Sequence, residues 1–468
     1  MLKINFKKSI IAIITIIFLS NVGPFVTTID ASDPTTRSDD PTANVADLTA
    51  NSSTASNSTT NPTMIDAKIY NLDITGLSDT SILFQKMIDS HPSGASLKLP
   101  KGIYKFSNIV KLKDGIKLIA ESGVTIIGTG KNTLFSTGNH NSFQGIAFQN
   151  CATALSVFQK NGLNIVNCRF TNNIDYAAIN FYGSRDCSVT GSYFYDIHKY
   201  GILIDNDSSD ITIDKNNFDN PKVFGGYTDA QISGHIYCLN GTKIKVTNNI
   251  LKNSGGQGVI FGYNSTTGKG TTSSVASNNQ CLGNGQEGAT IYGGKDKVTS
   301  ENSLIDNTCK NNRFNQIEIW QSANNIVQGN TVEESITGTG NLGAITLFAT
   351  TGTTCTGNNI LSAQKNGIAI IAGSSNCNVS DNYISNTNGQ NDINTPEKGN
   401  GILLDWNGVA DPQYITIQSN VIGSSNAIIA KSGVYSTSNT NHHNKISGNI
   451  ITDYKYGVHS YALSTCGE

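Results

Sequence analysis

The chain has 468 residues, a formal net charge of −2 at pH 7 and only 14% charged residues. With no basic patch and no run of like charges, the composition argues against nucleic-acid binding and against charge-driven attachment to a membrane surface. Glycine occurs 46 times, and short segments of Asn, Ser and Thr recur along the chain.

The N-terminus has the features of a secretory signal. Three lysines precede an apolar run from Ile10 to Leu19, and residues 29–31 form a candidate small-residue cleavage site. The run is shorter than the about 20 residues that a membrane-spanning helix needs. An uncleaved membrane anchor is the alternative, but we expect residues 1–31 to be a signal peptide and the protein to be secreted and extracellular.

The next segments predict a linker and then the start of a folded domain. Residues 32–63 contain almost no large apolar residue, so we expect a disordered Ser/Thr/Asn-rich linker. The folded domain is expected to span residues 64–468. Its first element is an amphipathic helix over residues 79–91, with an apolar face of Ile82, Leu83, Met87 and Ile88. Residues 96–106 and 115–130 alternate like β-strands.

Most of the remaining chain consists of one sequence unit that is repeated many times. Residues 367–384 show it in full: an apolar strand that opens on Gly, a polar turn, and a short strand containing Asn382. The closing hexad recurs as, for example, IVNCRF, VTNNIL, VSDNYI and ISGNII. A period of about 22 to 38 residues indicates stacked units.

Such a unit is too small to fold alone, so its strands must pair with those of the next unit. Equivalent strands would lie about 4.8 Å apart, with inward Ile, Val and Phe in columns. Asn at one turn of every coil tolerates left-handed backbone angles and can hydrogen-bond to the next coil. The sequence therefore predicts an all-β parallel β-helix of about a dozen coils, with the helix at residues 79–91 capping one end.

The nine cysteines do not suggest a disulfide framework. Cys281 and Cys309 replace the large apolar residue that closes the hexad, and Cys355 replaces its opening Val. These are core positions, where Cys acts as a small hydrophobe. We expect mostly free, buried thiols, and no His or Cys spacing is typical of structural zinc.

Residues 78–106 resemble the opening of the right-handed parallel β-helix proteins of the pectate lyase superfamily. Those proteins begin with an Asp-Thr helix and continue with a Leu-Pro-x-Gly-x-Tyr strand, here Leu99, Pro100, Gly102 and Tyr104. The repeats from about residue 140 to 462 are similar to the coils of that superfamily. The resemblance implies the fold, and its members include polysaccharide lyases, polygalacturonase-like hydrolases and epimerases.

Alternation along the Gly-initiated strands predicts which side chains face outward. If the Gly is position zero, positions two and four face out. The outward set then includes Phe181, Asp205, Tyr292, Glu318, Trp320 and Asp405. Aromatic and acidic side chains along a flat sheet suit a sugar chain, although a decorated solvent-facing sheet would look the same.

Two candidate centres follow from this placement. The first comprises the catalytic candidates Asp175, His198, Asp205, Asp229 and His235, beside the long loop 219–233. It could supply an acid and a base of separated pKa. The second is Glu318 with Tyr292, Trp320 and Arg313, where Arg would bind a uronate carboxylate. Phe181, Lys199 and Lys222 are further candidates for substrate binding.

Spacing separates the two centres. Asp205 and Glu318 lie four coils apart, roughly 19 Å at strand spacing. The two carboxyl groups of a glycosidase lie roughly 5 to 9.5 Å apart. Asp205 and Glu318 therefore cannot form one acid–base pair, and the partner of Asp205 must come from its own or an adjoining coil.

The motifs implied by the resemblance are incomplete. The turns that match the Asn-Thr-Asp, Asp-Asp and Gly-His-Gly motifs of polygalacturonases read Asn-Ile-Asp at 173–175, His-Lys at 198–199 and Gly-His-Ile at 234–236. The Asp pair is missing, and so is the Asp-Pro-His of mannuronan epimerases. Pectate lyases use calcium, carboxylates and a basic residue, and Asp205, Asp207 and Lys222 are the candidates for Ca²⁺ chemistry here.

The expected function is therefore an extracellular enzyme that acts on an acidic polysaccharide bound along one flank. As a lyase, or less expectedly an epimerase, it would use His198, Lys199 or Lys222 to remove the proton next to a uronate carboxylate. As a glycoside hydrolase it would use Asp205 with Asp229 or Asp175. The alternative is a non-catalytic β-helix that binds glycans or adheres to a surface. Neither reading involves nucleic acid, or a membrane after signal cleavage.

Overall fold

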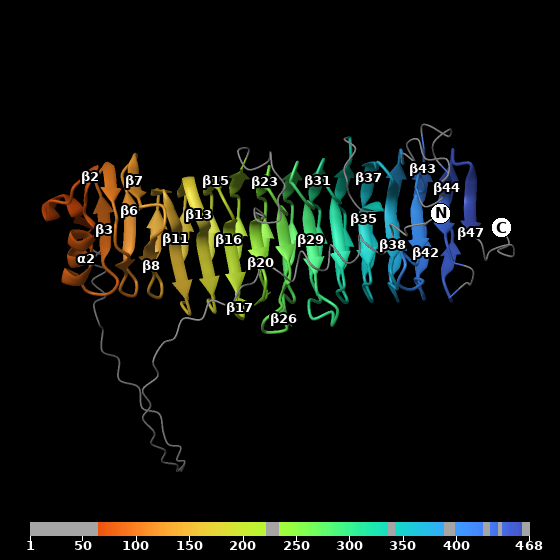
Figure 1. Cartoon of the computed structure of the whole chain (residues 1–468), viewed down its shortest axis with the longest axis horizontal. Helices are drawn as coiled ribbons and strands as arrows, with labels where there is room; N and C mark the ends of the chain where they lie inside the picture. The colour runs from red at the N-terminus through yellow and green to blue at the C-terminus, as the bar shows by residue number, and fades with distance from the viewer. Residues whose placement is uncertain are drawn as a thin grey trace, which may run out of the picture. The chain divides into compact units, whose positions relative to one another are not determined.

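The computed structural model describes residues 64–220, 234–335, 342–387, 398–424, 431–438 and 442–460. Three short strands form each coil, and each pairs in parallel with the equivalent strand of the next coil, for example Lys245–Thr247 with Val275–Ser277. Figure 1 shows the strands stacked in chain order from the orange end of the chain to β47 at the blue end. The predicted parallel β-helix is confirmed. Residues 1–63, the expected signal peptide and linker, lie outside the described residues, and no described helix is long and apolar enough to cross a membrane.

The first sheet has 15 strands, one from each coil. In spatial order they are β1 Ile65–Asp66, β3 Ser96–Leu99, β6 Lys117–Ala120, β9 Ser142–Gln144, β12 Asn164–Val166, β14 Ser188–Thr190, β18 Thr212–Asp214, β22 Lys245–Thr247, β27 Val275–Ser277, β30 Ser303–Ile305, β33 Ile326–Gln328, β36 Thr354–Thr356, β39 Asn378–Ser380, β42 Thr416–Gln418 and β45 Lys445–Ser447.

The other two faces are joined through β13, which pairs with one strand near its start and with another near its end. The second face contains β2 Thr75–Asp79, β4 Gly102–Lys105, β7 Val124–Ile127, β10 Ala147–Gln149, β13 Arg169–Tyr182, β15 Tyr193–Ile197, β19 Asn217–Asp219, β23 Ile250–Lys252, β28 Gln280–Leu282, β31 Thr308–Lys310, β34 Thr331–Glu333, β37 Asn359–Ser362, β40 Tyr383–Ser385, β43 Val421–Gly423 and β46 Ile450–Thr452.

The third face contains the Gly-initiated strands. Its members are β5 Val110–Lys111, β8 Thr133–Ser136, β11 Cys151–Phe158, the end of β13, β16 Tyr200–Asp205, β20 Gly234–Cys238, β24 Val259–Phe261, β29 Ala289–Tyr292, β32 Ile317–Trp320, β35 Gly343–Phe348, β38 Asn366–Ile371, β41 Ile402–Asp405, β44 Ser432–Ser436 and β47 Tyr456–Ser460. Two small sheets lie at the turns: β17 Ser208–Ser209 with β21 Gly241–Thr242, and the hairpin of β25 Tyr263–Asn264 and β26 Lys269–Gly270.

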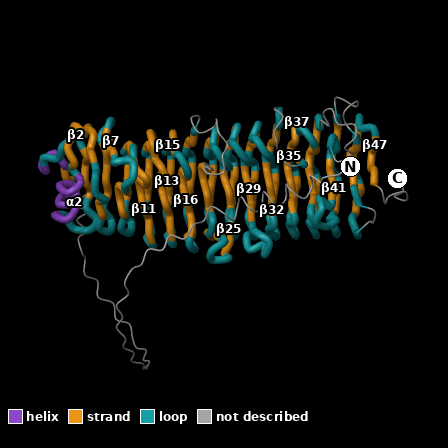
Figure 2. Tube along the Cα trace, viewed as in Figure 1, coloured by secondary structure: helices purple, strands orange, loops and turns teal. Residues whose placement is uncertain are grey.

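Helix α2, Ser81–Ser90, follows the short 3-10 helix η1, Ala67–Tyr70, and lies at the N-terminal end of the coils (Figure 2). The predicted helix is confirmed, but its apolar face differs. Ile82 and Leu83 are 59% and 44% exposed, whereas Phe84 is fully buried with Met87 and Ile88. Because Phe84, Met87 and Ile88 repeat at spacings of three and four, they define the buried face and turn Ile82 outward.

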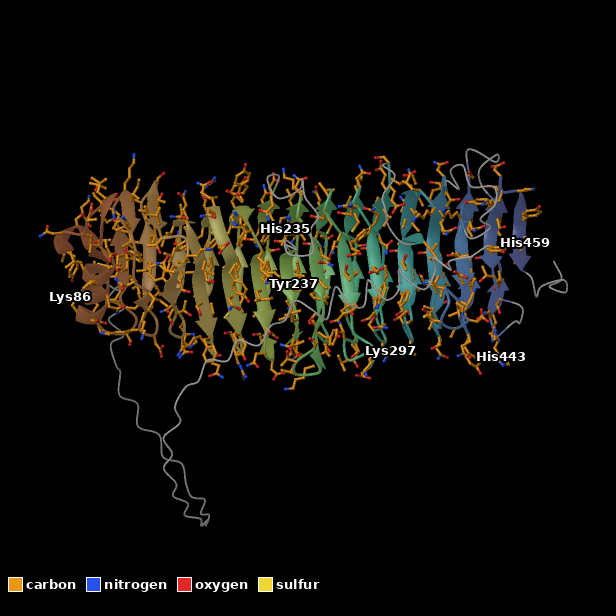
Figure 3. All side chains as sticks on the ribbon, viewed as in Figure 1. Lys86, His235, Tyr237, Lys297, His443 and His459 are labelled. Atoms are coloured by element: carbon orange, nitrogen blue, oxygen red, sulfur yellow. The ribbon has the colours of Figure 1, made fainter. Side chains whose placement is uncertain are left out.

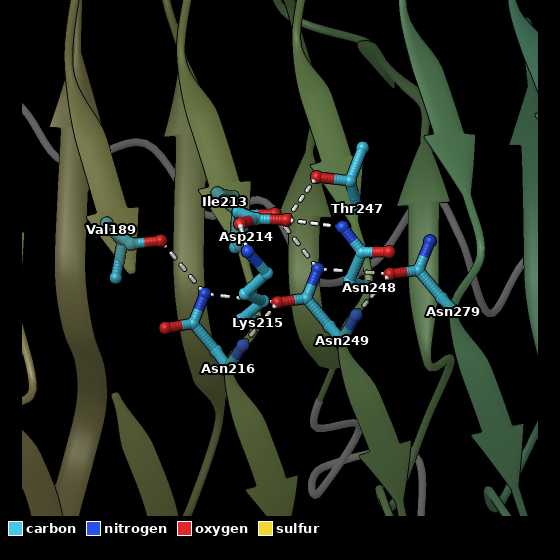
Figure 4. Close-up of polar contacts among 9 residues, drawn as sticks. All are labelled: Val189, Ile213, Asp214, Lys215, Asn216, Thr247, Asn248, Asn249 and Asn279. Atoms are coloured by element: carbon cyan, nitrogen blue, oxygen red, sulfur yellow. Dashed lines mark hydrogen bonds and ion pairs between the residues drawn. The ribbon is translucent and has the colours of Figure 1, made fainter. Parts of the chain in front are cut away.

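A ladder of asparagines runs along one turn of the solenoid. Figure 4 shows three of its rungs, in which the backbone nitrogen of Asn216 donates to Oδ1 of Asn249, and that of Asn249 donates to Oδ1 of Asn279, each at 2.9 Å. The side-chain nitrogen of Asn216 reaches back to the carbonyl of Val189 at 2.9 Å. The ladder continues through Asn307, Asn330, Asn358, Asn382, Asn420 and Asn449.

The interior is a continuous apolar column. Phe148, Phe170, Phe194 and Phe218 stack in successive coils, with ring centroids 5.1, 4.7 and 4.1 Å apart. The eight cysteines in the described residues are free and buried, as predicted, and Cys281 pairs in register with Cys309. Burial raises the pKa of the Cys355 thiol to about 12, so this thiol is a core residue rather than a nucleophile.

Candidate functional site

The register of the third face fixes which side chains point outward. Ile202 and Ile204 are fully buried in the core, and the residues between and after them point out. Three outward rows follow, named by their place in each strand relative to position zero. The leading row, just before position zero, contains Tyr200, Gln257, Glu287 and Asn315; the second row contains Leu203, Tyr237, Ile260, Thr290 and Glu318; the fourth row contains Tyr182, Asp205, Tyr292, Trp320 and Phe348.

Phe181 is not on the outward face, so its predicted role in substrate binding is wrong. Its side chain is fully buried, and it pairs in register with the inward Ile204. Tyr182, the partner of Asp205, occupies the outward position instead and is 37% exposed. The strand β13 has no Gly at position zero, so the predicted outward position on this strand was wrong by one residue.

Glu318 and Asp405 occupy outward positions as predicted, but they are not exposed. Their relative exposures are 5% and 7%. Asp405 accepts a hydrogen bond from Thr437 at 2.6 Å, and Glu318 accepts one from Asn315 at 2.7 Å. Outward apolar residues pack into two clusters outside the main core, so this face is partly covered rather than open to water.

Aromatic side chains follow one another along the fourth row. The rings of Trp320 and Phe348 stack with centroids 3.8 Å apart, and those of Tyr292 and Trp320 lie 6.3 Å apart. Tyr263, from the β25–β26 hairpin, lies 5.4 Å from Tyr292. Tyr292 and Trp320 are partly exposed. We call Tyr263, Tyr292, Trp320 and Phe348 the aromatic row.

The structure brings Asp175 and His198 together on adjoining coils. Nδ1 of His198 lies 3.5 Å from Oδ1 of Asp175, and the ammonium of Lys131 lies 2.9 Å from Oδ2. The hydrogen bond from Lys131 is the main reason that the pKa of Asp175 lies below its ordinary value. Asp175 is therefore ionised at neutral pH and can orient the imidazole of His198.

Lys199 lies between two tyrosine rings beside this pair. Its ammonium is 5.5 Å from the ring centroid of Tyr176 and 5.2 Å from that of Tyr200. The rings of Tyr176 and Tyr200 are 5.7 Å apart, and Tyr237 continues the group at 5.0 Å from Tyr200. We call Asp175, Tyr176, His198, Lys199 and Tyr200 the lysine–tyrosine cluster.

Burial shifts the pKa values of three members of this cluster, Lys199, Tyr176 and Tyr200. It lowers the pKa of Lys199, and it is the main cause of the raised pKa values of Tyr176 and Tyr200. The negative charge of Asp205 raises both tyrosine pKa values further. The phenols therefore remain protonated donors at neutral pH, while Lys199 releases its proton more readily than a solvated lysine.

Asp205 lies on the outward face, but its carboxylate is engaged by the β25–β26 hairpin. The amide of Asn264 donates to its two oxygens at 3.0 and 2.9 Å, and the backbone nitrogen of Asn206 donates at 2.7 Å. Burial raises the pKa of Asp205. Asp207 is likewise held by Lys269 at 2.7 Å and by Asn240 at 3.2 Å. These oxygens face amides and an ammonium, so the pair does not fit the expected Ca²⁺ site.

His235 is buried in the core, so its predicted place in the catalytic cluster is wrong. Its side chain is 1% exposed, lies 5.4 Å from the ring of Phe218, and meets the carbonyl of Lys252 at 2.7 Å. Figure 3 labels His235 beside Tyr237 of the same strand. His235 occupies position zero, where the chain bends and the side chain enters the core, so it cannot reach a substrate outside.

The burial of His235 predicts a loss of stability in acid. Burial lowers its pKa from 6.5 to about 4. Between these values the unfolded chain binds a proton that the folded chain does not, so stability falls as pH drops. The slope is about 1.4 kcal/mol per pH unit, or about 2 kcal/mol between pH 7 and pH 5.

Urea unfolding at the two pH values measures this loss. His235→Gln is the variant of choice because Gln316 occupies the equivalent position in another coil, fully buried. We expect the variant to lose about 2 kcal/mol less than the wild type on acidification. His443→Gln, at a distant turn, is expected to behave like the wild type. Equal losses in wild type and His235→Gln would contradict this account.

The remaining predicted site residues are Asp229, Lys222 and Arg313. Asp229 and Lys222 lie outside the described residues. Arg313 is partly buried in the turn before β32, where its backbone nitrogen donates to the carbonyl of Asn284 at 2.9 Å. The residues missed are Tyr176, Tyr200, Gln257, Glu287, Thr290 and Asn315. Tyr200, Gln257 and Glu287 each stand one residue before a Gly at position zero, so extending the count by one residue would have found these three.

Comparison with known proteins gives the family. The model of the right-handed β-helix region matches residues 105–273 and 234–411. A search of curated proteins found no match. Solved structures that resemble the chain share its fold at low identity.

Three of these structures illustrate the range. The surface adhesin PfbA of Streptococcus pneumoniae is 18% identical over 78% of this chain and 93% of its own, with a TM-score of 0.55. The A-module of the Azotobacter vinelandii mannuronan C-5 epimerase AlgE4 is 14% identical over 86% of this chain and 100% of its own, with a TM-score of 0.52. The catalytic unit of a GH87 α-1,3-glucanase from Streptomyces thermodiastaticus is 10% identical over 86% and 71%, with a TM-score of 0.51.

Proposed function

The chain belongs to the right-handed β-helix family, and we propose that it is an extracellular member that binds and modifies an acidic polysaccharide. The observation that carries the proposal is the pairing of His198 with Asp175 next to Lys199, on adjoining coils. The lysine–tyrosine cluster thus combines a base, a carboxylate that orients it, a cation and phenolic hydrogen-bond donors.

The proposed reaction is removal of the proton next to a uronate carboxylate. His198, oriented by Asp175, takes this proton, and the ammonium of Lys199 neutralises the charge that builds on the substrate carboxylate. Tyr200, which its raised pKa keeps protonated, donates a hydrogen bond to the departing glycosidic oxygen, and this oxygen takes a proton from water as its bond to the uronate ring breaks. Elimination would give an unsaturated sugar, whereas reprotonation from the other side would give an epimer.

The aromatic row is proposed to hold the neighbouring sugars. Aromatic rings cover the apolar faces of sugar rings, and Tyr292 and Trp320 are partly exposed in adjoining coils. Two of the three similar structures are named for polysaccharide enzymes and one for an adhesin, which supports a polysaccharide ligand without choosing between catalysis and binding.

The test combines a substrate panel with a binding measurement. We expect the wild type to release unsaturated ends from, or change the uronate configuration of, at least one uronate-containing polysaccharide, and to leave neutral polysaccharides intact. Trp320→Ala should weaken binding of that polysaccharide about 10-fold, equivalent to about 1.4 kcal/mol. Tyr383→Ala, an exposed aromatic on the second face, is the matched control and should not change binding.

The outcomes separate the alternatives. New reducing ends without unsaturation would indicate hydrolysis and overturn the proposed proton abstraction. Binding that depends on Trp320 but yields no product would indicate an adhesin-like function. No binding to any member of the panel would remove the polysaccharide proposal altogether.

A further inference from the structure

A group of buried oxygen atoms lies in the outward rows of the third face and begins two coils beyond the lysine–tyrosine cluster. It consists of Gln257, Glu287, Thr290, Asn315 and Glu318, which we call the oxygen cluster. All five side chains are at least nine-tenths buried, with exposures of 2%, 6%, 3%, 0% and 5%. None of them takes part in the proposed reaction, so this inference does not depend on the proposed function.

The backbone places these residues side by side. Gln257, Glu287 and Asn315 stand in the leading row of three successive coils, joined by hydrogen bonds from Gly258 to the Glu287 carbonyl at 3.1 Å and from Gly288 to the Asn315 carbonyl at 3.3 Å. In the second row, Thr290 of β29 pairs in register with Glu318 of β32.

One side-chain hydrogen bond lies within the leading row, and another joins the leading row to the second row. The amide nitrogen of Gln257 donates to Oε2 of Glu287 at 3.2 Å, and that of Asn315 donates to Oε1 of Glu318 at 2.7 Å. Each of the two carboxylates thus accepts a hydrogen bond from one of these amides. The oxygen of each amide belongs to the same planar group as the nitrogen that contacts the carboxylate.

Three neutral oxygens of the cluster lack a hydrogen-bond partner. Gln257 Oε1, Asn315 Oδ1 and Thr290 Oγ1 are buried and accept no hydrogen bond within the described part of the chain. Buried acceptors are nearly always satisfied in folded proteins. Here three unsatisfied oxygens belong to the same cluster as two buried carboxylates. This combination indicates a positively charged ligand.

We propose that the oxygen cluster is a binding site for one Ca²⁺ ion. Ca²⁺ takes six to eight oxygen ligands from carboxylates, amide carbonyls and hydroxyls, and its charge balances Glu287 and Glu318. Mg²⁺ fits less well because it keeps several waters, for which a site made of buried side-chain oxygens leaves little room. The described residues contain no group of three or more His, Cys, Asp or Glu suited to a metal. The proposed site has two carboxylates and takes its other ligands from neutral oxygens.

The site would tie three coils together beneath the aromatic row. Gln257, Glu287 and Glu318 come from successive coils. Glu287 lies just before β29, which contains Tyr292, and Glu318 lies in β32 with Trp320. Bound Ca²⁺ would therefore stabilise this part of the solenoid and fix the strands that present those two rings.

Calorimetry and thermal unfolding of the chelator-treated full chain test the site. We expect one equivalent of CaCl₂ to bind the wild type and to raise its thermal midpoint, since a ligand of the folded state alone stabilises it. The paired substitution Glu287→Gln and Glu318→Gln should abolish both effects. Glu333→Gln, which removes a partly exposed carboxylate paired with Lys310, is the matched control and should keep them.

A milder variant covers the case in which the paired substitution disturbs folding. Thr290→Val removes one oxygen ligand without changing the charge, and we expect it to weaken Ca²⁺ binding about 10- to 100-fold. Absence of any Ca²⁺ effect on the wild type would overturn the proposal. So would unchanged Ca²⁺ affinity in Thr290→Val or in the paired variant. Equal responses to MgCl₂ and CaCl₂ would overturn the assignment of the ion.

Discussion

His198→Gln is expected to lower the rate of product formation from the uronate polysaccharide by about 10²- to 10⁴-fold, the usual contribution of a positioned general base. Glutamine keeps the size and polarity of the side chain but cannot accept the substrate proton. Polysaccharide binding should persist, because the aromatic row is untouched. The measurement is the initial rate of unsaturated-end formation or epimerisation at saturating substrate.

The Asp175 carboxylate provides a second arm of the same experiment. Asp175→Asn removes the charge that orients the imidazole but leaves the base in place, so we expect a smaller loss than in His198→Gln. The two substitutions together should cost no more than His198→Gln alone, because residues that act as a unit are not additive. His443→Gln is the control. A His198→Gln enzyme that retains wild-type rates would eliminate His198 as the base.

Breaking the asparagine ladder is expected to cause a large loss of stability. Asn279→Ala removes the acceptor for the backbone and side-chain nitrogens of Asn249, at 2.9 and 3.0 Å, and the donor to the Val246 carbonyl at 2.8 Å. Each buried group left without a partner costs about 1–3 kcal/mol, so we expect a destabilisation of about 3 kcal/mol or more.

Urea unfolding of the two proteins measures this difference. Asn164→Ala is the matched control. The side chain of the exposed Asn164 accepts one hydrogen bond within the described residues, from Ser188 at 2.8 Å, so its loss should change the free energy of unfolding by less than about 1 kcal/mol. Should Asn279→Ala prove no more harmful than Asn164→Ala, the ladder would be a by-product of turn geometry rather than a source of stability.

The repeat itself made the fold predictable. Alternating apolar positions, a Gly at the start of one strand and an Asn before another fix both the coil and the direction of its side chains, as Ile202 and Ile204 show. Counting positions from the Gly gave the wrong direction for Phe181, because that strand lacks the Gly. It also could not predict whether an outward side chain such as Glu318 is exposed. Direction depends on the local backbone, whereas the burial of Glu318 depends on neighbours from other coils.

The candidate site was predictable only where its members are close in the coil register. Asp175 and His198 stand in equivalent turns, so grouping them required only the repeat. The hydrogen bonds from Asn264 to Asp205 arise from a hairpin 59 residues further along the chain, which no spacing rule anticipates. Glu287 escaped attention because the leading row lies before the Gly that marks each strand, in a stretch resembling an ordinary turn.

The spacing of the asparagine ladder also determines how the molecule would respond to tension. Asn358 and Asn382 are adjacent rungs separated by 24 residues. Because the bonds between coils point along the axis of the solenoid, a stretching force loads them directly. Peeling one coil from the end would release about 80 Å of extended chain. The solenoid would thus lengthen in discrete steps set by its repeat and absorb mechanical work one coil at a time.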